Sequence, residues 1–178
     1  IKTMTMTGQE IKVALSEKHD HFLHFLTGLP EESFMKQAGN KWSAGQQLEH
    51  IFLSLKPVRQ ALSLPKFVLH MIWGKSNRPG RNYDELVKKY QQKLAEGGKA
   101  PNRFIPKPVT MERRKSLERS LSAEIVTLIQ KTDRFSEIEL DNYVLPHPLL
   151  GKLTLREMLL FTIYHVQHHQ HTIQCNIE

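Results

Sequence analysis

The sequence predicts an all-α protein, a four-helix up-down bundle with one extra short helical segment. Three features support this prediction: apolar residues recur at helical spacing in several long segments, capping motifs precede these segments, and glycine or proline follows them. Packing against one another is the natural way for four such helices to bury their apolar stripes. The 178 residues are enough for one core, and we expect a single domain over residues 1–178.

Local signals delimit the first two predicted helices. The first spans residues 8–27 and stops at a Gly-Leu-Pro sequence over 28–30. The second spans about 43–64. It opens with a serine and Gln46 three residues later, which match a capping box. Pro57 lies inside this segment and predicts a kink.

The middle of the chain is predicted as short pieces and loops. Residues 66–73 form a short apolar segment with helical character, and residues 74–81 form a loop. A further helix begins at a capping sequence near Asn82 and ends at Gly97. Residues 101–108 are rich in proline, which predicts an extended linker or the rim of a pocket.

The last third of the chain is predicted to contain two long helices. The first, over residues 110–132, is capped by its threonine. Residues 133–151 are expected to be irregular. The final helix begins at a second capping box, formed by Thr154 and Glu157, and continues to near the C-terminus. The irregular segments, together with residues 101–108, are expected to build any pocket.

Composition excludes several classes of protein. The formal net charge is +7, but the basic residues are dispersed, and the densest cluster is residues 113–115. We therefore do not expect nucleic acid to be the main partner. No apolar run reaches the roughly 18 residues of a membrane-spanning helix, and no signal peptide is visible. Cys175 is the single cysteine, which excludes an internal disulfide and agrees with a cytoplasmic location.

Histidines crowd the last predicted helix. His165 and His169 are four residues apart, so their imidazoles lie on the same face of an α-helix. That face also carries the apolar stripe and points into the bundle, where two unpaired imidazoles would be costly. Neutral imidazole is a common ligand of divalent metals, so the pair predicts part of a metal site. His165 with His168 is an alternative pair, whereas His171 is expected to face solvent.

A third ligand must come from another segment. His50 is the best candidate, because Gln47 and Ser54 lie three and four residues away and could form a polar patch with it inside the bundle. The spacing is equally compatible with a position of His50 on the protein surface. Glu49 is rotated by about 100° from His50 and is not expected to be a ligand. His19, His21 and His24 lack a regular i, i+4 pairing and carry no prediction.

Other residues have weaker claims to a role. His147 lies between two prolines and could line the rim of a pocket. Glu157 is two turns before His165, where it could orient a ligand, but its capping role explains it more simply. Cys175 is expected to be a small buried residue rather than a nucleophile. Contacts to a substrate are conceivable for three further residues, without a specific argument: Gln46, Gln47 and Tyr164.

Three passages of the sequence resemble the DinB-like family of helical metalloproteins, which includes bacillithiol- and mycothiol-dependent transferases. WSAGQQLEHI, at residues 42–51, is similar to the tryptophan-serine motif and histidine of the family's second helix. PHPLLGKLTLRE, at residues 146–157, is similar to the family's lead-in to the last helix. HVQHH, at residues 165–169, matches the family's HxxxH pair. The order and spacing of these passages make the resemblance specific.

The resemblance implies a DinB-like bundle in which His50, His165 and His169 hold one divalent ion. Nickel or zinc would be the first candidates, with iron, copper or manganese as others. It also implies a homodimer and a small-molecule substrate. Related enzymes use the metal to activate a low-molecular-weight thiol for attack on an electrophile.

Metal-dependent thiol transfer or hydrolysis of a small molecule is therefore the predicted function. The sequence contains no Ser-His-Asp arrangement, phosphate-binding glycine loop or paired-cysteine motif. The alternative is a non-catalytic, stress-related protein that binds a metal or dimerises. A fourth protein ligand would indicate such a structural site, whereas an open position would indicate catalysis.

Overall fold

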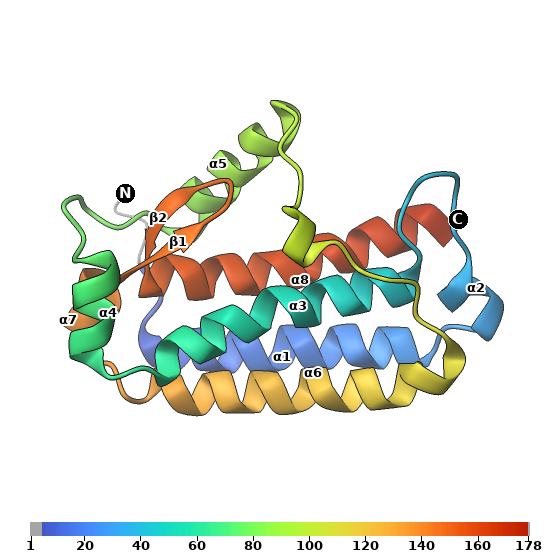
Figure 1. Cartoon of the computed structure of the whole chain (residues 1–178), viewed down its shortest axis with the longest axis horizontal. Helices are drawn as coiled ribbons and strands as arrows, with labels where there is room; N and C mark the ends of the chain where they lie inside the picture. The colour runs from blue at the N-terminus through green and yellow to red at the C-terminus, as the bar shows by residue number, and fades with distance from the viewer. Residues whose placement is uncertain (1–4, 178) are drawn as a thin grey trace.

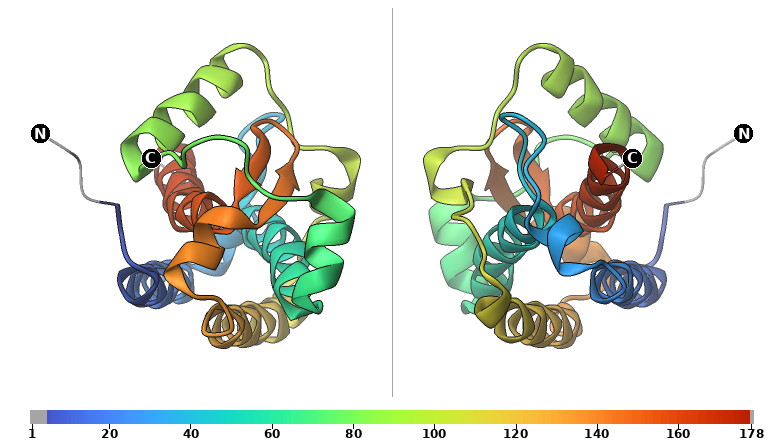
Figure 2. Two further views of the ribbon diagram at one scale, coloured as in Figure 1. Left: turned by 90° about the vertical axis from the view of Figure 1, so that its left-hand side faces the viewer. Right: turned by 90° about the vertical axis from the view of Figure 1, so that its right-hand side faces the viewer.

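The computed structural model describes residues 5–177 and shows a mostly helical protein (Figure 1). Four long helices form a bundle, which is seen end-on in Figure 2. They are α1 (Gly8–Thr27), α3 (Ala44–Ser63), α6 (Met111–Thr132) and α8 (Leu155–Ile177). The predicted all-α four-helix bundle is therefore confirmed.

The four helices do not follow one another around the bundle. Helix α3 packs between α6 and α8, and α1 packs between the same two helices on the other side. Helices α1 and α8 run in one direction along the bundle, and α3 and α6 run in the other (Figure 1). A long connection therefore returns the chain along the bundle between α3 and α6 and covers the face formed by α3 and α8.

Shorter elements make up this connection and the remaining links. Helix α5 (Tyr83–Ala95) packs on α8, and the 3₁₀ turn η1 (Asn102–Phe104) packs on α3. The other short helices are α2 (Glu31–Met35), α4 (Lys66–Trp73) and α7 (Glu137–Asn142). The expected helical segment at residues 66–73 is confirmed, and α3 continues through Pro57 without interruption of its helical assignment.

One prediction of an irregular segment is wrong. Residues 133–151 were predicted to be irregular, but they contain α7 and the strand β1 (Val144–His147). This strand pairs antiparallel with β2 (Gly151–Thr154), and His147 lies opposite Gly151. Gly151 has a φ of +73°, a conformation that residues with a side chain rarely adopt, so glycine permits the tight return. Four-residue strands containing a proline are too short to show a period-2 pattern in the sequence.

The core is a stripe of aliphatic and aromatic side chains shared by the four bundle helices. Periodicity identified this stripe correctly, since the positions at helical spacing are the buried ones. Helix α1 contributes Ile11, Leu15 and Phe22, and α6 contributes Leu121 and Leu128, all without exposed surface. Burial of side chains of this size contributes about 1.5–3 kcal/mol each, so the four-helix core is the main source of stability.

Capping explains where most helices begin. The predicted capping boxes at Ser43 and Thr154 form, and Thr7, Asn82 and Ser136 form three more. Thr110 occupies the N-cap position of α6, but its side chain makes no capping hydrogen bond to the backbone. Within residues 5–177, no helix is both long enough and apolar enough to cross a lipid bilayer.

The first turn of α8 is fixed by two buried charged residues. Arg156 donates hydrogen bonds to Asp141 and to backbone oxygens of Met6 and Glu137. Glu157 is 1% exposed and accepts hydrogen bonds from Arg78, Arg81 and the Thr154 amide. These contacts tie the start of α8 to earlier segments of the chain.

Candidate metal centre

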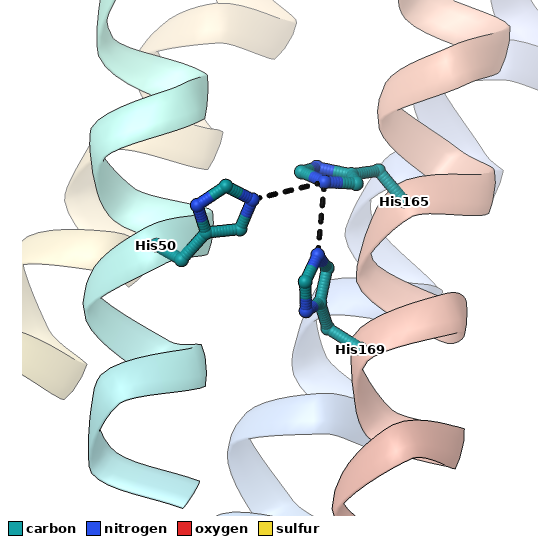
Figure 3. Close-up of side chains that lie close together, drawn as sticks. All are labelled: His50, His165 and His169. Carbon is teal, nitrogen blue, oxygen red and sulfur yellow. Dashed lines mark hydrogen bonds between the residues drawn. The ribbon is translucent and has the colours of Figure 1, made fainter. Parts of the chain in front are cut away.

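Three histidines from two helices meet inside the bundle. His165 and His169 lie one turn apart on α8, and His50 reaches them from α3 (Figure 3). All three are buried, with exposed fractions of 5–8%. Their ligand nitrogens lie within 4.8 Å of one another. The structure therefore brings together the three histidines that were expected to share a metal ion, and their binding of a metal stays a prediction.

The spacing of the nitrogens is compatible with one shared ion. His165 Nε2 lies 3.2 Å from His50 Nε2 and 3.0 Å from His169 Nε2. Two nitrogens bound about 2.1 Å from one ion, at angles of about 90–110°, are roughly 3.0–3.4 Å apart. The three side chains could thus hold a divalent metal without a large rearrangement.

The outer nitrogens fix the tautomers of two of the imidazoles. His50 Nδ1 donates to the carbonyl oxygen of Phe104 in η1, at 2.7 Å. His169 Nδ1 donates to Oε1 of Gln47, one turn before His50 on α3. A neutral imidazole carries only one proton, so both Nε2 atoms present lone pairs towards His165. Partners of this kind are typical around metal-binding histidines, because they orient the ring and raise its basicity.

Hydrogen bonds among the three imidazoles cannot satisfy all of their facing nitrogens. If His165 carries its proton on Nε2, it can donate well to only one of the two facing lone pairs. If it carries the proton on Nδ1, three lone pairs converge. Either arrangement leaves a buried acceptor without a hydrogen, which costs about 1–3 kcal/mol. A divalent cation would satisfy all three nitrogens at once, and this is the observation that makes the cluster a candidate metal centre.

Burial keeps these histidines neutral. It lowers the pKa of His165 well below 6.5, and the neighbouring imidazoles of His169 and His50 lower it further. The pKa of His169 is held well below 6.5 for the same reasons. Burial also lowers the pKa of His50, partly offset by the hydrogen bond to Phe104. At neutral pH all three are therefore in the unprotonated form that binds metals.

Aromatic rings enclose the cluster on two sides. Trp42, just before α3, lies with its ring centre 4.9 Å from that of His50 and stacks at 6.4 Å on His169. Phe161, one turn before His165, stacks on it at 4.8 Å. These rings restrict the imidazole rotamers. A pre-oriented set of ligands loses less conformational entropy on binding an ion.

A cavity of about 130 Å³ opens beside the cluster. His50 and His165 form part of its wall, together with apolar side chains of α3, α5 and α8. Its outer wall comes from two segments that were expected to build a pocket, the η1 region around Arg103 and residues 146–149 of the hairpin. A second, more open hollow lies on the other side of the cluster, where His169, Gln47 and Trp42 form part of its lining. The three histidines therefore lie between two spaces.

The structure decides between the alternatives that the sequence left open. His169, rather than His168, completes the buried group with His165. His171 is exposed, as expected. Glu49 is not part of the cluster; its carboxylate accepts hydrogen bonds from the Lys107 amide and from Arg113. His147 lines the cavity, as expected for a residue at a pocket rim.

Two further expectations concern Glu157 and Cys175. Glu157 forms the capping box and binds two arginines, so its role is to hold the start of α8 rather than to orient a ligand. The expectation that Cys175 is buried is wrong, because it is exposed, with Sγ 3.6 Å from His171 Nε2. Its rotation of about 120° from His169 turns it away from the core.

Sequence reasoning missed three contributors to the site. The bond from His169 to Gln47 could have been suspected, because Gln47 is one turn from His50 and shares its face. The carbonyl of Phe104 could not, since nothing local indicates that η1 returns to α3. His19 was set aside, yet it is fully buried and lines the cavity. Its Nδ1 donates to the Leu15 carbonyl at 2.8 Å, and its Nε2 has no hydrogen-bond partner among residues 5–177.

Comparison with protein families agrees with this architecture. A family model described as the DinB superfamily matches residues 14–173, which include all three histidines, the whole of α3 and most of α8. The chain belongs to the DinB superfamily. A search of curated proteins finds no match. Membership accounts for the bundle and supports a metal at the three histidines, but it does not assign a reaction.

Proposed function

We propose that this DinB-superfamily protein is a divalent-metal-dependent enzyme that acts on a small molecule. Its metal would be bound by His50, His165 and His169, with nickel or zinc as the first candidates and iron, copper or manganese as the next. The reaction would be transfer of a low-molecular-weight thiol to an electrophile, or hydrolysis. The convergence of three unprotonated nitrogens beside a cavity carries this proposal.

The chemistry follows from the donor set. A divalent ion held by neutral imidazoles would supply Lewis acidity, which favours deprotonation of a water or a thiol at neutral pH. The chain's own residues supply the rest. Gln47 and the Phe104 carbonyl orient two imidazoles, Trp42 and Phe161 fix the rings, and the apolar wall limits access of bulk water.

The number of protein ligands favours catalysis over a purely structural role. Structural zinc sites are closed by four protein ligands, whereas catalytic sites keep an open position. Among residues 5–177, the cluster contains three histidines and no fourth histidine, cysteine or carboxylate. The open side adjoins a cavity that can admit a small molecule. A non-catalytic metal-binding protein would need neither feature.

An activity panel tests the proposal. The protein is loaded separately with zinc or nickel and assayed with cysteine, bacillithiol or mycothiol against 1-chloro-2,4-dinitrobenzene, and with ester substrates for hydrolysis. We expect metal-dependent turnover that His165→Ala abolishes and His171→Ala, a change at an exposed histidine on the same helix, leaves intact. Equal rates for the wild type and His165→Ala with every pair would reject catalysis at this centre.

A further inference from the structure

The charged residues of the cavity are all cationic. Lys99 and Arg103 contribute to its outer wall, and the described lining contains no aspartate or glutamate. The remaining wall consists of apolar side chains, neutral histidines and the uncharged hydroxyl side chains of Ser54, Tyr90 and Thr162. A ligand with a positive group would meet only like charges here, whereas an anionic group would find partners. The wall therefore discriminates by the sign of the charge.

His147 adds a fixed hydrogen-bond donor to this wall. It ends β1, and its Nδ1 accepts hydrogen bonds from the backbone amides of Leu149 and Leu150, both at 3.1 Å. Because Nδ1 is the acceptor for two amides, the proton of the neutral ring must be on Nε2. No acceptor for Nε2–H is found among the described residues.

The position of His147 places this donor close to the candidate metal centre. Its ring lies edge-on to Phe161, with the ring centres 4.3 Å apart, and Phe161 in turn stacks on His165. His147 lines the same cavity as His50 and His165. A molecule in this cavity can therefore contact Nε2–H of His147 and the open side of the metal centre at the same time.

We propose that the cavity binds an organic anion about as large as a substituted benzene ring, and that His147 Nε2–H donates a hydrogen bond to its anionic group. Lys99 and Arg103 add favourable charge at the entrance. The size follows from the volume, since a cavity of about 150 Å³ holds benzene. This inference rests on the proposed function, because it names the class of substrate for that site.

Three probes of nearly equal size test the charge preference. Benzoate, benzamide and benzylammonium differ in the sign of one group and share the ring. Binding is measured by calorimetry or saturation-transfer NMR with zinc-loaded protein. We expect benzoate to bind about tenfold or more tightly than benzamide, as for a hydrogen bond to a charged acceptor, and benzylammonium to bind most weakly. Equal affinity for benzoate and benzylammonium would overturn the proposal.

Two substitutions separate the two nitrogens of His147. In His147→Asn the amide oxygen takes the position of Nδ1, so the turn keeps its acceptor while the donor is lost. In His147→Gln the amide nitrogen takes the position of Nε2, so the donor is kept while the turn loses its acceptor. We expect His147→Asn to weaken benzoate binding about tenfold with little loss of stability. We expect His147→Gln to lower the melting temperature and retain more of the binding.

Metal-free protein keeps this test independent of the proposed function. The preference for benzoate and its loss in His147→Asn should persist without zinc, because Lys99, Arg103 and His147 do not depend on the ion. If zinc does not bind but the preference is present, the metal proposal fails and the anion site stands. If His147→Asn binds benzoate as the wild type does, with and without zinc, the role of His147 is rejected.

Discussion

Two parts of α8 bury polar groups in opposite ways. In its first turn, Arg156 and Glu157 are almost without exposed surface, and surrounding residues supply hydrogen-bond partners and opposite charges. Two turns further on, His165 and His169 are equally buried, but their facing nitrogens meet only one another and His50. Polar groups that are fully satisfied by the protein indicate a structural role. Polar groups that converge without enough hydrogens indicate a missing ligand.

The largest expected contrast between the buried histidines of the molecule and the first turn of α8 is in their response to pH. Burial lowers the pKa of His19 and of His147 to about 4. Because the unfolded chain takes up protons below about 6.5 and these folded groups do not, their contribution to stability is complete above pH 6.5 and falls between pH 6.5 and 4. From pH 7 to 5 the loss is roughly 2 kcal/mol for each, and the buried triad adds to it.

The first turn of α8 responds in a lower pH range. Burial alone would raise the pKa of Glu157, but hydrogen bonds from Arg78, the Thr154 amide and the Arg81 amide outweigh it and lower the pKa below 4.5. Its contribution is therefore present above pH 4.5 and is lost only below that value. Urea unfolding of metal-free protein at pH 7, 6 and 5 separates the contribution of the buried histidines from that of Glu157. A constant free energy of unfolding over this range would contradict the burial of these histidines in the neutral form.

Removing Glu157 is expected to give the next largest effect. Glu157→Ala leaves two arginine side chains and two backbone amides without their acceptor, and we expect a loss of about 3 kcal/mol. For a chain of this length, the melting temperature should fall by roughly 6–12 °C. Thermal unfolding followed by circular dichroism measures it, with Glu157→Gln as the milder, isosteric control. Metal affinity of the folded variant should stay unchanged; a large loss would place Glu157 with the metal site instead.

A substitution at Gln47 tests the histidine part of this comparison, because Gln47 orients His169. Gln47→Leu removes the acceptor that orients His169, and we expect metal affinity to fall about 10–100-fold, with a small effect on the fold. Gln46→Leu is the matched control, because Gln46 caps α3 without touching the histidines. Calorimetric titration with zinc should show weaker binding for Gln47→Leu alone. Equal zinc affinities for the two variants would show that Gln47 does not support metal binding.

His19 should give the smallest effect. Its side chain has no exposed surface and its Nε2 has no partner within the described residues 5–177, so His19→Leu removes an unsatisfied buried group while keeping a similar apolar volume. We expect the free energy of unfolding at pH 7 to change by less than about 1 kcal/mol, in either direction. Denaturant unfolding checks this, and the share of His19 in the pH dependence should vanish. A loss above about 3 kcal/mol would show that Nε2 has a partner after all.

The sequence predicted what depends on regular periodicity. The apolar stripes located the four bundle helices, and the stripe on α8 selected His165 and His169 over His168 because the two share the buried face. Both inferences use only residues within two turns of one another, where helix geometry alone fixes relative positions. The spacing around His50 left a surface position equally open, and its place with the other two histidines was implied only by the resemblance to the DinB-like family.

The parts that the sequence did not predict depend on contacts between distant segments. The hairpin that carries His147 has strands of four residues, too short for a pattern, and the Phe104 carbonyl reaches His50 only through the path of the long connection. The exposure of Cys175 depends on which elements cover the end of α8. The lack of a hydrogen-bond partner for His19 Nε2 among residues 5–177 likewise follows from the packing of the bundle interior and not from the local sequence.

The most direct test of the account is the metal content of protein purified without a histidine tag. Elemental analysis and equilibrium dialysis against zinc or nickel would compare the wild type with His50→Ala, His165→Ala and His169→Ala, and with His171→Ala as the exposed control. We expect about one ion per chain in the wild type and in His171→Ala, and almost none in the other three, while all five remain folded. Equal metal content in the wild type and in His165→Ala would contradict the shared site.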